Sequence, residues 1–133
     1  YKGTAAGYVH DESRDITDAT LVKAIESRNN IIIDSTLRNP EKSKILFDEA
    51  RKKGYKVVLL SNIVPLEISL NRAVNRFLNP GEEGRYVPIE RIIREHDKTN
   101  RSQFELIKYA DKGKIFDSNV EKTEPLKMII SKG

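Results

Sequence analysis

Polar side chains follow the abrupt end of an apolar run in the first third of the chain. The run Ile31–Ile33 is β-branched and shows no alternation with polar residues, a pattern typical of a strand covered on both faces. Asp34, Ser35, Thr36 and Arg38 come directly after it. Because α/β folds bind ligands at the carboxyl ends of parallel strands, we predict that this stretch forms one wall of a binding site.

A second group of residues suited to chemistry consists of arginines. Arg72 and Arg76 are four residues apart and therefore lie on one face of a predicted helix, and Arg85 follows in a Gly-containing segment at 79–87. A guanidinium binds phosphate oxygens with two parallel hydrogen bonds, and a mobile arginine can stabilise a phosphoryl group in transfer. The alternative is that Arg72 and Arg76 only solvate their helix. The neighbouring segment, which we expect to be a mobile loop and a lid, favours the phosphate role.

The elements that must position these residues follow from apolar periodicity and from stop signals. Asn39-Pro40 has the features of a helix start, and Gly54 has those of a helix end. The predicted elements of the first two thirds are a helix at 13–28, a strand at 30–34, a helix from Asn39-Pro40 to Gly54, a strand at 55–63 and a helix from Val64-Pro65 to about Leu78. This alternation favours βαβ units and a parallel sheet.

The last third of the chain predicts one more helix and two short strands. The helix begins at Pro88 and ends at Gly113, and the polar stretch His96–Gln103 is expected to interrupt or kink it. The strands are predicted at 114–117 and 126–130, separated by a polar turn. We therefore expect one α/β domain over residues 1–133, with a P-loop kinase-like parallel sheet flanked by helices and truncated at its N-terminus.

Composition narrows the class of protein. No apolar run approaches the roughly 20 residues that span a bilayer, and the chain contains no cysteine, so disulfides and thiolate metal sites are excluded. We expect a cytoplasmic protein with no membrane partner. The net charge is +4, but acidic and basic residues are interspersed, which favours a solvated mixed-charge surface over a nucleic-acid interface.

The order of these motifs resembles the zeta toxin family of P-loop kinases, from about Ser13 to Asp117. The residues that carry the resemblance are Thr17, Asp18 and Ala19 on the first helix, Asp34, Ser35, Thr36 and Arg38 after the apolar run, Val64-Pro65, Arg76, and the series Arg85, Tyr86, Val87 and Pro88. The resemblance implies ATP-dependent phosphorylation of a sugar hydroxyl, with UDP-N-acetylglucosamine as the acceptor in the best-known members. It also implies ATP and Mg²⁺ as cofactors and an antitoxin protein as a possible partner.

The resemblance also implies a role for each matched residue. Asp18 and Thr36 would bind the sugar nucleotide and Arg38 would help to orient it, while Arg76 and Arg85 would contact the phosphates of ATP. Two positions depart from the family pattern, because Asp18 stands in place of Glu and Ser35 in place of Gly. Both departures concern the acceptor side of the site.

The sequence contains no G-x-x-x-x-G-K-[ST] motif for the phosphates of ATP. In the family this P-loop and the catalytic base lie upstream of the matched region, so we interpret the chain as a partial kinase domain. The strand that leads into the P-loop would lie between the strands at 30–34 and 55–63. We therefore expect the 133 residues alone to be inactive and marginally folded.

Other readings of the sequence stay open. His10 and His96 are too isolated to form a metal triad, so we predict no metal ligands in the chain. One rival function is a non-catalytic, degenerate module that binds a nucleotide or RNA. Another is a P-loop kinase that phosphorylates a different small hydroxyl compound.

Overall fold

The computed structural model describes residues 9–79, 86–121 and 123–133 of the chain. Two compact units divide it: residues 1–35 with 71–88, and residues 36–70 with 89–133. No helix within the described ranges is long and apolar enough to cross a membrane. The prediction that residues 1–133 form one domain stays a prediction.

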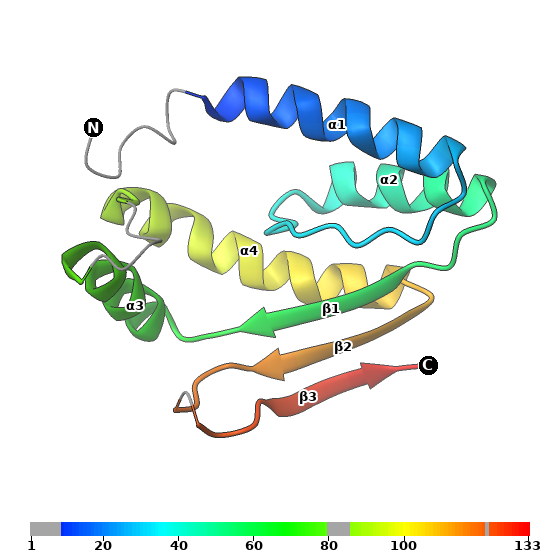
Figure 1. Ribbon diagram of the computed structural model, residues 1–133. Helices are drawn as coiled ribbons and strands as arrows, with labels where there is room; N and C mark the ends of the chain where they lie inside the picture. The colour runs from blue at the N-terminus through cyan, green and yellow to red at the C-terminus, as the bar shows by residue number, and fades with distance from the viewer. Residues whose placement is uncertain (1–8, 80–85, 122) are drawn as a thin grey trace. The chain divides into compact units, whose positions relative to one another are not determined.

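The second unit contains a three-stranded sheet, in the order β1-β2-β3 (Figure 1). Strand β1 (Val58–Ile63) pairs in parallel with β2 (Lys112–Asp117), and β2 pairs antiparallel with β3 (Lys127–Lys132). The α/β class with helices flanking a sheet is therefore confirmed. The sheet is mixed and not wholly parallel, because the short connection from β2 to β3 returns the chain alongside β2.

Helices α2 (Pro40–Lys52) and α4 (Ile89–Tyr109) build the core of this unit together with one face of the sheet. The buried apolar side chains come from all of these elements: Phe47 of α2, Leu59 of β1, Leu106 and Ile107 of α4, Ala110 after it, and Ile115 of β2. On the other face of β1, Leu60 is 70% exposed. Within the described part of this unit, the core therefore lies on one side of the sheet only.

Local signals set both ends of α2. The side chain of Asn39 accepts a hydrogen bond from the Lys42 backbone N–H at 3.1 Å, and Pro40 stands in the first helical turn. Gly54 follows the helix with a φ of 87°, in the left-handed region where glycine avoids a steric penalty. The predicted start and end of this helix are confirmed.

The first unit contains α1 (His10–Glu26) and the greater part of α3 (Leu66–Leu78), whose first turn belongs to the second unit. The ring of Tyr86 packs edge-on against that of Phe77 on α3, with 5.3 Å between the ring centroids. We predicted a mobile loop and a lid at residues 79–87, and residues 80–85 of this segment, including Arg85, lie outside the described residues.

The predicted strand at 30–34 is wrong, because residues 29–39 adopt no regular structure. Ile32 is fully exposed, and the sheet of the described residues consists of β1, β2 and β3 alone. A β-branched run becomes a strand only where a neighbouring strand satisfies its backbone N–H and C=O groups. Without such a ladder the run stays irregular.

The predicted interruption of the last long helix is also wrong. Helix α4 runs without a break for 21 residues and includes the whole polar stretch. Its predicted end at Gly113 is wrong as well, because the helix ends at Tyr109 and Gly113 lies inside β2. A Cβ atom added at Gly113 would lie 2.9 Å from Cγ1 of Ile107 and 3.0 Å from the carbonyl oxygen of Leu59. Glycine is therefore needed for the close approach of α4 to the sheet.

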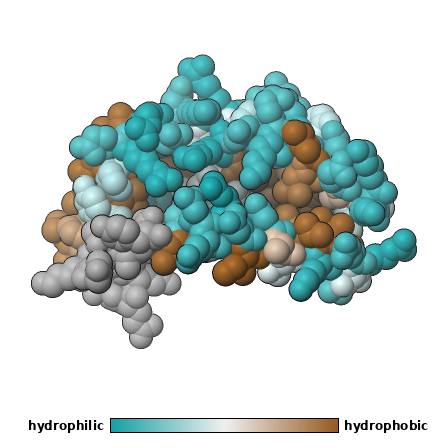
Figure 2. Space-filling model, turned by 90° about the horizontal axis from the view of Figure 1, so that it is seen from above, coloured by the Kyte–Doolittle hydropathy of each residue, from teal (hydrophilic) through white to brown (hydrophobic). Residues whose placement is uncertain are grey.

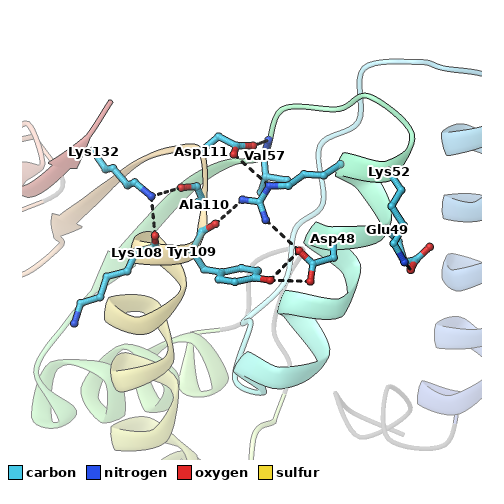
Figure 3. Close-up of polar contacts among 10 residues, drawn as sticks. Asp48, Glu49, Lys52, Val57, Lys108, Tyr109, Ala110, Asp111 and Lys132 are labelled. Atoms are coloured by element: carbon cyan, nitrogen blue, oxygen red, sulfur yellow. Dashed lines mark hydrogen bonds and ion pairs between the residues drawn. The ribbon is translucent and has the colours of Figure 1, made fainter.

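A cluster of polar groups joins the end of α4 and the turn after it to α2 and to the residue before β1 (Figure 3). The Asp111 carboxylate accepts a hydrogen bond from the Val57 backbone N–H at 2.7 Å and one from Arg51 at 3.2 Å. Tyr109 donates its hydroxyl hydrogen to Asp48 of α2. The Val57 N–H, with further help from Arg51, holds the pKa of Asp111 below its ordinary value. The cluster fixes the end of α4 against α2 and the start of β1.

The surface is mixed in character. The face drawn in Figure 2 is largely hydrophilic, with apolar side chains in separate patches among the polar ones. This distribution agrees with the interspersed charges of the sequence.

Gly113→Ala should destabilise the protein by about 1–3 kcal/mol, because the added methyl group meets Ile107 and the Leu59 carbonyl in a packed core. Urea denaturation would measure the change. Ser131→Ala, at an exposed position of β3, is the control and should change the stability by less than about 0.5 kcal/mol. Equal stability of the Gly113→Ala variant and the parent would contradict the close approach of α4.

Asp111→Asn should lower the stability at neutral pH, and the difference from the parent should shrink only as the pH falls below the ordinary pKa of the carboxyl group towards its lowered folded value. The pKa of Asp111 is lowered in the folded state, so its carboxylate stabilises the fold above the ordinary pKa, and this stabilisation is lost as the pH falls through the folded value. Thermal melts of the parent and variant across the acid range would measure it. Asp97→Asn is the control, because its ion pair with Arg101 is exposed, and it should change the stability little.

Candidate functional site

The segment Thr36–Arg38 is held by hydrogen bonds from α4 to its backbone. Nε2 of Gln103 donates to the carbonyl oxygen of Thr36 at 2.8 Å, and the hydroxyl of Ser102 donates to the carbonyl oxygen of Leu37. On the segment itself, the acceptors of both bonds are main-chain carbonyl oxygens, and the Thr36 hydroxyl takes no part in them. Thr36 and Arg38 are both exposed.

Leu37 lies between them in an unusual backbone conformation. Its φ is 49°, in the left-handed region, which costs a residue other than glycine about 1–2 kcal/mol. Its side chain packs against the hydrophobic core, whereas Thr36 and Arg38 on either side are exposed. The turn at Leu37 therefore anchors the segment inward through one side chain and leaves a hydroxyl and a guanidinium at the surface.

An ion pair connects Arg38 to α4. Nη1 of Arg38 lies 3.8 Å from Oε2 of Glu95, and Oε1 of the same carboxylate accepts a hydrogen bond from Nε of Arg94 at 3.2 Å. The bond from Arg94 is the main cause that lowers the pKa of Glu95 below its ordinary value, and the charge of Arg38 adds to it. Glu95 is therefore negatively charged at neutral pH and attracts the Arg38 guanidinium.

A further polar residue of α4, His96, contacts the chain just after β1. Nε2 of His96 lies 2.8 Å from the carbonyl oxygen of Val64, just before Pro65. A carbonyl oxygen only accepts, so this ring nitrogen carries the hydrogen. Side chains of α4 thus bind backbone carbonyls at two places in the chain, at Thr36 and Leu37 and at Val64 just after β1.

Sequence reasoning missed these α4 residues because it took a polar stretch for a break in the helix. Glu95 and His96 precede Ser102 and Gln103 by seven residues, so each pair lies on one helical face. Leu106 and Ile107 continue the same stripe into the core. The seven-residue spacing of these polar residues could have indicated a continuous helix. The inward face of α4 is polar where it meets backbone carbonyls and apolar where it packs against the side chains of the core.

The other predicted site residues belong to the first unit. Asp18 is exposed on α1, and Arg76 is exposed on α3, on the same helix as Arg72. The structure brings Thr36 and Arg38 together on one segment, and Asp18 and Arg76 are on separate helices. Arg85 lies outside the described residues.

The described residues do not by themselves supply a site for ATP and Mg²⁺. No three His, Asp or Glu side chains among them gather as metal ligands. The glycines of the sequence form no phosphate-binding loop of the Walker A type. What the described residues do supply is an exposed hydroxyl and an exposed guanidinium on a fixed backbone, groups that bind sugar hydroxyls and phosphate oxygens.

Replacing either arginine next to Glu95 should raise the pKa of its carboxyl group towards the ordinary value. Arg94→Met should raise it more than Arg38→Met does, because the bond from Arg94 is the larger cause of the lowering. Carboxyl ¹³C NMR titration would measure both changes. Arg101→Met, whose ion pair is with Asp97, is the control and should leave Glu95 unchanged. A Glu95 titration insensitive to Arg38→Met would contradict the ion pair.

Comparison with known proteins gives one match. A family model described as zeta toxin matches residues 1–121 of the chain. No curated protein and no solved structure matches. The matched region covers most of the chain and includes every predicted site residue. The chain therefore belongs to the zeta toxin family, a family of P-loop kinases that bind nucleotides.

Proposed function

We propose that the protein is an ATP-dependent kinase that phosphorylates a sugar hydroxyl of UDP-N-acetylglucosamine or a related sugar nucleotide. The acceptor's hydroxyl oxygen gives up its proton to a general base and forms a bond to the γ-phosphorus of ATP, the bond from that phosphorus to the bridging oxygen breaks, and ADP leaves. ATP supplies the phosphoryl group. The residues of this chain bind and orient the acceptor and offset phosphate charge, and we assign them no proton transfer.

One observation carries the proposal: in a chain of the zeta toxin family, Thr36 and Arg38 are exposed on a backbone that α4 holds in place. A hydroxyl can both donate to and accept from a sugar hydroxyl, and a guanidinium matches the oxygens of a diphosphate. A fixed backbone limits the entropy lost when a ligand binds. These properties suit the recognition of a sugar nucleotide.

The other assigned residues complete the proposal. Asp18 binds a hydroxyl of the sugar nucleotide through its carboxylate, which is one methylene shorter than the glutamate of the family. Arg76 and Arg85 contact the phosphates of ATP and stabilise the charge that develops on the transferring group. Family membership supports an antitoxin protein as a partner.

Thr36→Val should weaken the binding of UDP-N-acetylglucosamine by about fivefold to tenfold and leave ATP binding unchanged. The substitution removes the hydroxyl at nearly constant shape and keeps the backbone carbonyl that Gln103 binds. Isothermal titration with each ligand, and phosphorylation assays by mass spectrometry with the complete natural protein, would measure both effects.

Thr20→Val is the matched control. The Thr20 hydroxyl is exposed on α1 and donates only to the Ile16 carbonyl one turn earlier, so its loss should alter neither affinity. Weaker binding of ATP alone in the Thr36→Val variant would place this residue on the donor side. If the protein phosphorylates another small hydroxyl compound and no sugar nucleotide, the proposed kinase activity stands and the proposed acceptor is wrong.

A further inference from the structure

Gln103 occupies a position where a polar side chain is unusual. It is 4% exposed and lies on the stripe of α4 that continues into the core at Leu106 and Ile107. Burying an amide costs free energy unless its hydrogen bonds are made, so an apolar residue would be the simpler choice for packing. The amide therefore performs a task that packing does not require.

Both ends of the Gln103 amide are used. Its Nε2 donates to the Thr36 carbonyl, and its Oε1 accepts a hydrogen bond from the Ser61 hydroxyl, each at 2.8 Å. The orientation of the amide is fixed, because the carbonyl oxygen can only accept. One side chain thus connects α4, the central part of β1 and the Thr36–Arg38 segment.

The conformation of the segment needs such a connection. A left-handed residue such as Leu37 persists only where its surroundings over-determine it. Gln103 binds the carbonyl before Leu37, and Ser102, which is 2% exposed, binds the carbonyl after the Leu37 Cα. The hydrogen bonds from Gln103 and Ser102 therefore hold the backbone just before and just after the left-handed residue Leu37.

From this geometry we infer that Gln103 is a positioning residue for the acceptor site: it sets the place of Thr36 relative to β1 and thereby controls affinity for the sugar nucleotide. The inference rests on the proposed function, which assigns acceptor binding to Thr36. Gln103 acts through the Thr36 backbone and does not touch the acceptor. Its loss therefore affects the acceptor and spares ATP.

Two variants separate the two bonds. Gln103→Leu removes both, whereas Gln103→Glu keeps an acceptor for Ser61 and loses the donor to Thr36. Both variants should raise the dissociation constant for UDP-N-acetylglucosamine by about tenfold or more, since small displacements of a binding group have large effects. The dissociation constant for ATP should stay within about twofold. Backbone NMR resonances of residues 36–38 should shift in both variants.

Ile115→Val is the control for stability. Ile115 is fully buried in the same core, and its truncation should lower the melting temperature while both affinities and the resonances of residues 36–38 stay as in the parent. Ser61→Ala, which keeps the bond from Gln103 to Thr36, should weaken acceptor binding less than Gln103→Glu does.

The outcomes distinguish this inference from the proposed function. If the parent binds the sugar nucleotide and the Gln103→Glu variant binds it equally well, Gln103 has no positioning role and the proposed function stands. If the parent does not bind the sugar nucleotide, the proposed acceptor is wrong. The backbone NMR resonances of residues 36–38 in the two Gln103 variants then test the positioning role of Gln103. Shifted resonances at 36–38 then support the positioning of Thr36, and unchanged ones overturn it.

Discussion

Backbone carbonyls outside the sheet impose the main constraint on this fold. The carbonyl oxygens of Thr36, Leu37 and Val64 each accept a hydrogen bond from a side chain of α4. Ser102 and Gln103, which donate two of these bonds, are buried, and a buried polar group without a partner costs about 1–3 kcal/mol, a large part of a typical stability of about 5–15 kcal/mol. The carbonyls therefore supply the partners that the polar residues on the inward face of α4 need.

The apolar half of the same helix makes the arrangement rigid. Leu106 and Ile107 pack into the core, the missing side chain at Gly113 lets the helix approach the sheet, and Asp111 ties the following turn to Val57 and Arg51. Interiors packed in this way transmit displacements because they contain few voids. Core packing therefore fixes α4 at its C-terminal end, and α4 in turn holds the segment Thr36–Arg38 by hydrogen bonds from Ser102 and Gln103.

Features that depend on neighbouring residues in the sequence could be predicted, and features that depend on distant partners could not. The start and end of α2 followed from Asn39, Pro40 and Gly54, whose effects are local. The run Ile31–Ile33 gave a strand signal, but a strand also needs a neighbour, and the residues described here provide none to it. Thr36 and Arg38 were predicted as binding residues from their place after the apolar run, and that role stays a prediction. The hydrogen bond from Gln103 to Thr36 could not be predicted, because it depends on a backbone carbonyl 67 residues away in the sequence.

The hydrogen bonds that hold Thr36 and Leu37 reach main-chain oxygens, which every amino acid has. The hydrogen bonds from α4 therefore do not depend on the side chains at positions 36 and 38. Position 37 is restricted by its left-handed backbone and by its partly buried side chain, which packs against the core. Exposed side chains on this segment can change during evolution without loosening the segment itself. Under the proposed function, a substitution at position 36 or 38 would therefore alter the affinity for the acceptor and leave the scaffold that holds the segment unchanged.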